Sequence, residues 1–186
     1  MTTLAQKITI PVKNALVKNI LLSFLGSIAI AISAQITVPM FPVPMTMQIF
    51  AVLSVGMVLG SRFGALSVAM YLAEGAMGLP VFAGGGFGVA SLLSASGGYL
   101  FGFVLSAYIV GRLAEAGFDK TASKTFFAMI IGTIAIYSVG LVWLGTVVGW
   151  DKPILAWGFT PFIIGDLVKS GVASALFPAL WKKLSK

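Results

Sequence analysis

The chain has 186 residues, of which 59% are hydrophobic and only 9% are charged, and its mean hydropathy is +1.05. Because soluble domains contain about 25% charged residues, this composition predicts an integral membrane protein. The sequence has no Cys and no His, which excludes thiol nucleophiles, imidazole bases and the usual zinc, copper and haem ligands. The net charge of +7 comes from basic residues at the ends of apolar runs, which is typical of membrane anchors rather than of a nucleic-acid-binding surface.

We expect a single integral membrane domain, 1–186, that starts with a basic segment over about 1–18. Lys7, Lys13 and Lys18 precede the apolar run 20–34, a combination that also occurs in signal peptides. Since this run leads directly into a second apolar stretch, it is expected to stay in the protein as an uncleaved first span.

Hydropathy predicts an all-α membrane protein with six transmembrane helices, over about 18–36, 46–60, 62–77, 92–113, 124–148 and 160–182. The second and third helices are short for a bilayer, which needs ~20 apolar residues. Only the turn GSRFG at 60–64 separates them. They are therefore predicted to form a tight helical hairpin, or broken elements whose ends are buried in protein.

The basic residues predict the orientation. With six spans, one side of the membrane carries Lys7, Lys13, Lys18, Arg62, Arg112, Lys120, Lys124, Lys182, Lys183 and Lys186. The other side carries only Lys152, and Lys169 lies within a span. The positive-inside rule then places the N- and C-termini in the cytoplasm of a multi-pass protein of the cell (inner or plasma) membrane.

The three connections on the opposite side, 36–46, 78–91 and 149–159, have unusual compositions. The first has three prolines between 39 and 44 and is predicted to be a stiff extended strap. The second contains the glycine run 84–86, where a backbone can approach a ligand closely, and the third contains two tryptophans. Two interpretations stay open: plain interfacial turns, or a lid over a pocket.

The first predicted helix carries small residues at helical spacing. Ser27 and Ala31 are four apart, as are Ala29 and Ser33. Such residues let another helix approach closely, and packing is the main force that joins helices in lipid. The partner is either another helix of this chain or a separate membrane subunit.

Asp166 and Lys169 are a lone pair of opposite charges within the last apolar helix. Their i, i+3 spacing places them on one helix face. If Thr160 caps this helix and Pro161 occupies its first turn, Asp166 lies ~9 Å and Lys169 ~14 Å along it. The pair is either a structural ion pair or a polar site that a ligand completes. Acceptors beside donors suit a ligand with N–H next to C=O, such as an amide or a urea, and equally a carboxylate- or proton-handling site.

No catalytic constellation is present in the sequence. There is no G-x-S-x-G elbow and no P-loop, so we expect a non-enzymatic protein that does not hydrolyse ATP and has no cofactor. Glu74, near the outer end of the third predicted helix, is expected to be an interfacial or loop-facing carboxylate.

Four stretches resemble the biotin-specific S components of energy-coupling-factor transporters, the BioY family. They are AQITVPMFPVPMTMQIFAVLSVGMVLG (34–60), YLAEGAMGLPVFAGG (71–85), SGGYLFGF (96–103) and GDLVK (165–169). The resemblance covers roughly 30–180. The sequence differs from the common family pattern at Ser94–Ala95–Ser96, where Gly-Pro-Thr or Gly-Pro-Ser is frequent, at Gly86, where some members have a polar residue, and at Glu74, where an apolar residue is usual.

The resemblance implies a six-helix membrane protein that mediates biotin uptake and binds the vitamin from outside, in a pocket roofed by the first and third loops. Asp166 would accept an N–H of the ureido ring, and Lys169 would donate to the ureido oxygen. The other residues expected to contact biotin are Gln48, Phe82, Gly84, Gly85, Gly86 and Tyr99.

The resemblance also implies partners. Ser27, Ala29, Ala31 and Ser33 would dock on a transmembrane coupling subunit, which works with ATPase subunits. Whether the chain acts alone, with a dedicated module or with a shared module stays open. The alternatives are a self-sufficient secondary carrier for an organic anion, with Asp166–Lys169 as a proton-linked site, and a structural membrane subunit.

Overall fold

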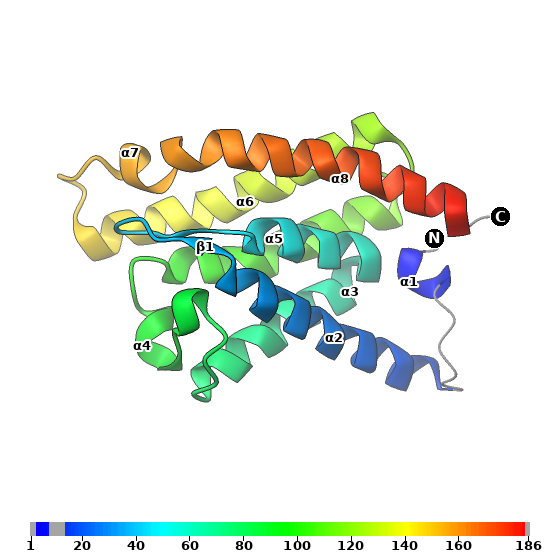
Figure 1. Cartoon of the computed structure of the whole chain (residues 1–186), viewed down its shortest axis with the longest axis horizontal. Coiled ribbons are helices and arrows are strands. Elements are labelled where there is room, and N and C mark those ends of the chain that lie inside the picture. Colours follow the sequence, from blue (N-terminus) through cyan, green and yellow to red (C-terminus); the bar gives the residue numbers. More distant parts are fainter. Residues whose placement is uncertain (1–2, 8–13, 185–186) are drawn as a thin grey trace.

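The computed structural model describes residues 3–7 and 14–184 (Figure 1). The helices are α1 (Leu4–Lys7), α2 (Ala15–Gln35), α3 (Gln48–Ala76), α4 (Gly88–Leu92), α5 (Gly97–Glu115), α6 (Ala122–Val148), α7 (Ile154–Gly158) and α8 (Ile163–Leu184). Strands β1 (Thr37–Val38) and β2 (Met45–Thr46) pair antiparallel, and 3-10 turns form at η1 (Ala83–Gly85) and η2 (Thr160–Phe162). Five helical stretches of the described chain are long and apolar enough to cross a membrane. The predicted all-α membrane fold is therefore confirmed.

Helix α3 consists of two arms, 48–59 and 61–76, that fold back on each other. The Gln48 side-chain amide donates to the Tyr71 hydroxyl at 2.7 Å. In a straight helix these residues would be ~35 Å apart. Gly60 makes the turn with φ 81° and ψ −179°, a conformation that favours glycine. Of the two alternatives predicted for the second and third helices, the structure shows the tight hairpin, and Figure 1 shows both arms under the label α3.

The end of α5 holds the α3 turn in place. Glu115 Oε1 accepts hydrogen bonds from the backbone N–H and the hydroxyl of Ser61, both at 2.8 Å. Arg112, one turn earlier, donates to the other carboxylate oxygen at 3.2 Å. These bonds satisfy an N–H group of the second arm that has no partner within its own helix.

Helices α3, α5 and α6 form the centre of the bundle. A Cβ atom at Gly56 would lie 2.6 Å from the Ala107 carbonyl oxygen, so glycine is required for α3 to approach α5 this closely. Met57, Val110 and Ile136 are wholly buried between these helices. Helices α2 and α8 lie outside this centre, and most of their apolar side chains face outward, where lipid covers them in a membrane protein.

The bundle has two different ends. The basic end contains α1, the start of α2, the α3 turn, the α5–α6 connection and the end of α8 (Figure 1). The predicted basic residues gather there, and Lys152 lies at the opposite end; Lys13 and Lys186 are outside the described residues. The opposite end contains the β1–β2 hairpin, the segment 77–96 and the segment 149–162. We call it the cavity end, because a cavity lies between these segments and the helices.

Two expected boundaries differ in the structure. The segment predicted to start a helix at 92 forms the separate helix α4 and then turns, and α5 begins only at Gly97, whose backbone lies against the Leu92 carbonyl. Thr160 does not cap the last helix, because its hydroxyl donates to the Leu155 carbonyl at 3.1 Å. Pro161 lies in η2, and α8 follows from Ile163.

Candidate ligand-binding site

A cavity of about 400 Å³ lies at the cavity end of the bundle. This volume is within the range of small-molecule sites. The β1–β2 hairpin, the segment from η1 to Ser96, and helices α3, α5, α6 and α8 all contribute to its wall. Its polar lining residues are Thr46, Gln48, Ser91, Ser94, Ser96, Tyr99, Tyr137, Asp166 and Lys169.

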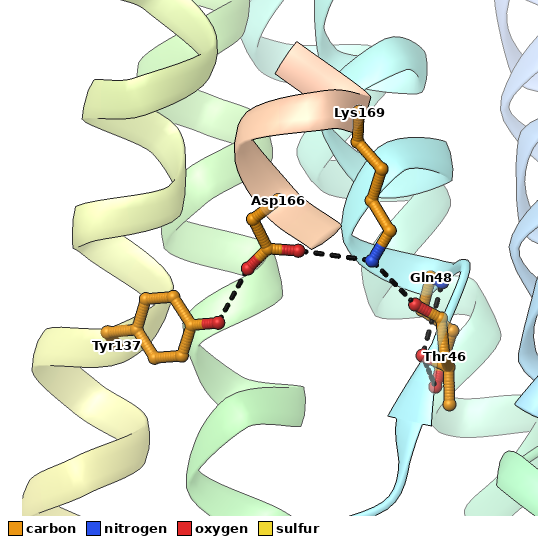
Figure 2. A network of polar contacts seen from close by, with 5 residues as sticks. All are labelled: Thr46, Gln48, Tyr137, Asp166 and Lys169. Carbon is orange, nitrogen blue, oxygen red and sulfur yellow. Dashed lines mark hydrogen bonds and ion pairs between the residues drawn. The ribbon is translucent and has the colours of Figure 1, made fainter. Parts of the chain in front are cut away.

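A buried polar network forms one side of the cavity (Figure 2). Tyr137 donates its hydroxyl proton to Asp166 Oδ2 at 2.5 Å, and Lys169 Nζ donates to Asp166 Oδ1 at 3.0 Å. Lys169 also donates to the Thr46 carbonyl oxygen at 3.0 Å. The side chains of Asp166 and Lys169 are only 5% and 13% exposed. Both charges are therefore largely removed from water, and each is compensated by the other.

The network still has hydrogen-bonding capacity for a ligand. An ammonium group has three N–H donors, and the described contacts of Lys169 use two of them. A carboxylate has about four lone-pair positions, and the bonds from Tyr137 and Lys169 occupy two of those on Asp166. A group with N–H beside C=O can therefore bind here without breaking the bonds already present.

The network is also connected to the β1–β2 hairpin and to α3. The Thr46 hydroxyl donates to Gln48 Oε1 at 3.2 Å, and Gln48 in turn donates to Tyr71. Because Lys169 binds the Thr46 carbonyl, α8 is joined to the hairpin at the point where the hairpin covers the cavity. The three prolines expected to stiffen this strap lie between the two strands.

Gln35, the last residue of α2, holds the segment 81–85 in place. Its amide nitrogen donates to the carbonyls of Val81 and Phe82, at 3.4 and 3.2 Å, and its oxygen accepts from the N–H of Gly85 at 3.1 Å. The Phe82 ring packs edge-on against Tyr71, with ring centroids 5.4 Å apart. The segment is therefore attached to both α2 and α3.

Six of the residues predicted to bind a ligand line the cavity: Gln48, Phe82, Gly86, Tyr99, Asp166 and Lys169. Gly84 and Gly85 are not among its lining residues; both have positive φ in the turn η1, whose first residue, Ala83, does line the cavity. Tyr99 donates its hydroxyl proton to the Gly158 carbonyl at 2.8 Å and so also ties α5 to α7.

Sequence reasoning missed Tyr137 and Thr46. A buried tyrosine usually has a hydrogen-bond partner for its hydroxyl, so Tyr137 within an apolar helix was a usable signal. Thr46 had no such signal, because it takes part through its backbone carbonyl.

The small residues of α2 do not share one exposed face. Ser27 and Ser33 are buried within the chain, Ala31 is half-buried and Ala29 is exposed. The Ser27 hydroxyl lies 2.8 Å from Glu74 Oε1 on the second arm of α3. Glu74 is thus half-buried and contacts α2 rather than a loop.

The chain is similar to known proteins both in its sequence and in its fold. The sequence profile of the BioY family matches residues 2–186. The biotin transporter BioY of Thermotoga maritima is 42% identical over 156 residues, which are 83% of this chain and 90% of that protein. The probable biotin transporter BioY of Pyrococcus horikoshii is 38% identical over 143 residues, which are 77% of this chain and 83% of that protein.

The fold gives the same result. A crystal structure described as the S-component for biotin from an ECF-type ABC transporter superposes with a TM-score of 0.77. The match covers 93% of this chain and 95% of that one, at 27% sequence identity. With a family profile along almost its whole length, relatives above 30% identity and a shared fold, this chain belongs to the BioY family.

Proposed function

We propose that this chain is the biotin-binding membrane subunit of an energy-coupling-factor transporter and mediates biotin uptake. The observation that carries this proposal is the network of Tyr137, Asp166 and Lys169 on the wall of the cavity. Asp166 has acceptor positions that are not used within the chain, and Lys169 beside it has one unused N–H donor. This combination suits a cyclic urea. The names of the BioY relatives and of the superposing S-component support biotin as the ligand.

In this proposal the ureido ring lies on the network. Asp166 accepts a ureido N–H, and Lys169 donates its remaining proton to the ureido oxygen. Tyr137 orients the carboxylate, because its bond to Oδ2 leaves Oδ1 with Lys169. The apolar rings of Phe82 and Phe103, which also line the cavity, suit the sulfur-containing ring and the aliphatic chain of biotin.

The proposed partners are a transmembrane coupling subunit and its ATPase subunits. Helix α2 is the candidate docking element, since it lies at the edge of the bundle and exposes Ala29 together with apolar neighbours such as Ile32. Ser27 would act from inside, by holding α2 on α3 through Glu74, whereas the buried Ser33 donates to the Ile30 carbonyl of α2 itself. The basic end would face the cytoplasm of the cell membrane under the positive-inside rule.

Two measurements test the function. A binding isotherm of the purified full chain with biotin should be saturable and stoichiometric, and related vitamins should bind far more weakly. Uptake of labelled biotin into vesicles should then be compared with and without the coupling and ATPase subunits. No biotin binding would refute the function, and full uptake without ATPase subunits would favour a self-sufficient carrier.

A further inference from the structure

The cavity has two polar sides that differ in charge. One side is the network of Asp166, Lys169 and Tyr137 on α6 and α8. The other side consists of serine hydroxyls, those of Ser91, Ser94 and Ser96, on α4 and the turn that follows it. Figure 1 shows α4 and α8 on opposite sides of the β1–β2 hairpin. Among the described residues that line the cavity, Lys169 is the only cation and Asp166 the only anion.

The network disfavours an anionic ligand group. Asp166 and Lys169 are 3.0 Å apart and form a neutral unit. An anion placed on Lys169 would also lie close to the Asp166 carboxylate, and repulsion between like charges is strong where water is largely excluded. A neutral group with both N–H and C=O meets no such repulsion, so this side selects the ureido end of biotin.

The serine side has hydroxyls in place of a counter-ion. The Ser91 hydroxyl donates to the Phe87 carbonyl at 2.8 Å, and the Ser94 hydroxyl donates to the Ser91 carbonyl at 2.7 Å. The hydroxyl protons of Ser91 and Ser94 are thus already used within the chain, and Ser96 contributes a neutral hydroxyl with no charge. Ser94 is exposed, so this side of the cavity is open to water. A carboxylate buried without a partner is costly, whereas one that stays in water is not.

We infer that the site recognises biotin by its ureido end and leaves its carboxylate unpaired, in water, beside Ser91 and Ser94. The inference rests on the proposed function. It follows that the site also binds neutral derivatives of biotin. Compounds in which the carboxyl group is converted to a small ester or amide should bind about as tightly as biotin itself. The ureido group, by contrast, tolerates no blocking of its N–H.

The test compares the affinities of the purified chain for biotin, biotin methyl ester and biotinamide. The two neutral compounds should bind within about fivefold of biotin, since an exposed charge contact contributes no more than that. A biotin methylated on a ureido nitrogen should bind at least about 100-fold more weakly. A loss of about tenfold or more for both neutral compounds overturns the inference, because it would reveal a desolvated partner for the carboxylate.

A variant separates the two ways in which Lys169 could act. In Lys169→Met, biotin and biotinamide should weaken by the same factor if Lys169 serves the ureido end. Selective weakening of biotin would place the carboxylate on Lys169 and overturn the inference. Lys152→Met is the matched control, because Lys152 is exposed at the same end of the bundle and does not line the cavity; it should change neither affinity by more than about twofold. The ligand series on the unaltered chain needs no variant to fold.

The two proposals fail differently. If biotin itself does not bind, the proposed function is wrong. If biotin binds and both neutral compounds do not, only the present inference is wrong.

Discussion

Each end of the bundle contains a buried aspartate that accepts a hydrogen bond of 2.5 Å from an aromatic side chain. At the cavity end, Tyr137 donates to Asp166; at the basic end, Trp181 donates to Asp119, which lies between α5 and α6. Asp166 also has Lys169 and the cavity beside it. Asp119 is 0% exposed, and its Oδ1 has no hydrogen-bond partner among the described residues.

The comparison shows what distinguishes a binding carboxylate from a structural one. The aromatic donor is common to both ends, so it does not by itself indicate a ligand. What differs is open space and hydrogen-bonding capacity within reach of a ligand, which only Asp166 has of the two. At the basic end, Lys120 Nζ lies 5.0 Å from the centre of the Trp181 ring, so the cluster ties the α5–α6 connection to the end of α8.

The largest expected effect is that of Asp166→Asn on ligand binding. The variant removes the charge that compensates Lys169 and replaces an acceptor by a donor, so biotin affinity should fall by about 100-fold. Isothermal titration of the purified protein measures this loss. Membrane insertion and the thermal transition serve as controls, and Asp119→Asn should leave the affinity unchanged. Normal biotin binding by Asp166→Asn would show that the Asp166–Lys169 pair does not bind the ligand.

Trp181→Phe should show the reverse of Asp166→Asn, with reduced stability and unchanged biotin affinity. It leaves the buried Asp119 carboxylate without its aromatic donor, which should lower the free energy of unfolding by about 2 kcal/mol. Unfolding in detergent measures the change, and the biotin dissociation constant should stay the same. The double variant with Asp119→Asn should recover much of the stability, because no buried charge is then left unpaired. A large loss of biotin affinity would show that the two ends are coupled.

Tyr137→Phe tests a positioning role at the cavity end. The ring and its packing stay, and only the hydrogen bond to Asp166 Oδ2 is lost. We expect about tenfold weaker biotin binding, because a hydrogen bond to a charged group contributes about 1.5 kcal/mol. Tyr99→Phe is the matched control: it removes the bond to Gly158 on α7 and should act through stability instead. If Tyr137→Phe binds biotin normally, Tyr137 does not orient the carboxylate.

The smallest expected effect is the pH dependence that Asp119 adds to stability. Burial raises the pKa of Asp119 above its ordinary value in the folded chain. The folded state therefore holds this proton more tightly than the unfolded state does, and stability falls as the pH rises from about 4 through the raised pKa. Asp119→Asn should remove this part of the slope. Unfolding between about pH 4 and pH 7 measures it, and a slope unchanged by the substitution would contradict the assignment.

Some residues of the site were predictable, either because they are charged within an apolar helix or because they lie in stretches that resemble the family. Asp166 and Lys169 stand out as charges in an apolar helix, and Gln48 and Phe82 lie in stretches that resemble the family. Tyr137 gave a more general signal, because a buried phenol needs a hydrogen-bond partner, but only the tertiary structure shows that this partner is Asp166 on α8. The glycine run showed that the loop backbone is unusual, but it did not show that Gly86 lines the cavity while Gly84 and Gly85 do not.

The sequence by itself determined the membrane class, the glycine turn between the two short helices, the clustering of basic residues at one end and the charged pair on one face of the last helix. These follow from hydropathy, from glycine at a turn and from the helical period, all of which act over a few residues. Only the tertiary structure decided that Asp166 accepts from Tyr137, that Lys169 binds the Thr46 carbonyl, and that Ser27 packs inside on Glu74 while Ala29 faces out. Those contacts join residues far apart in the chain, and their partners depend on how the helices pack.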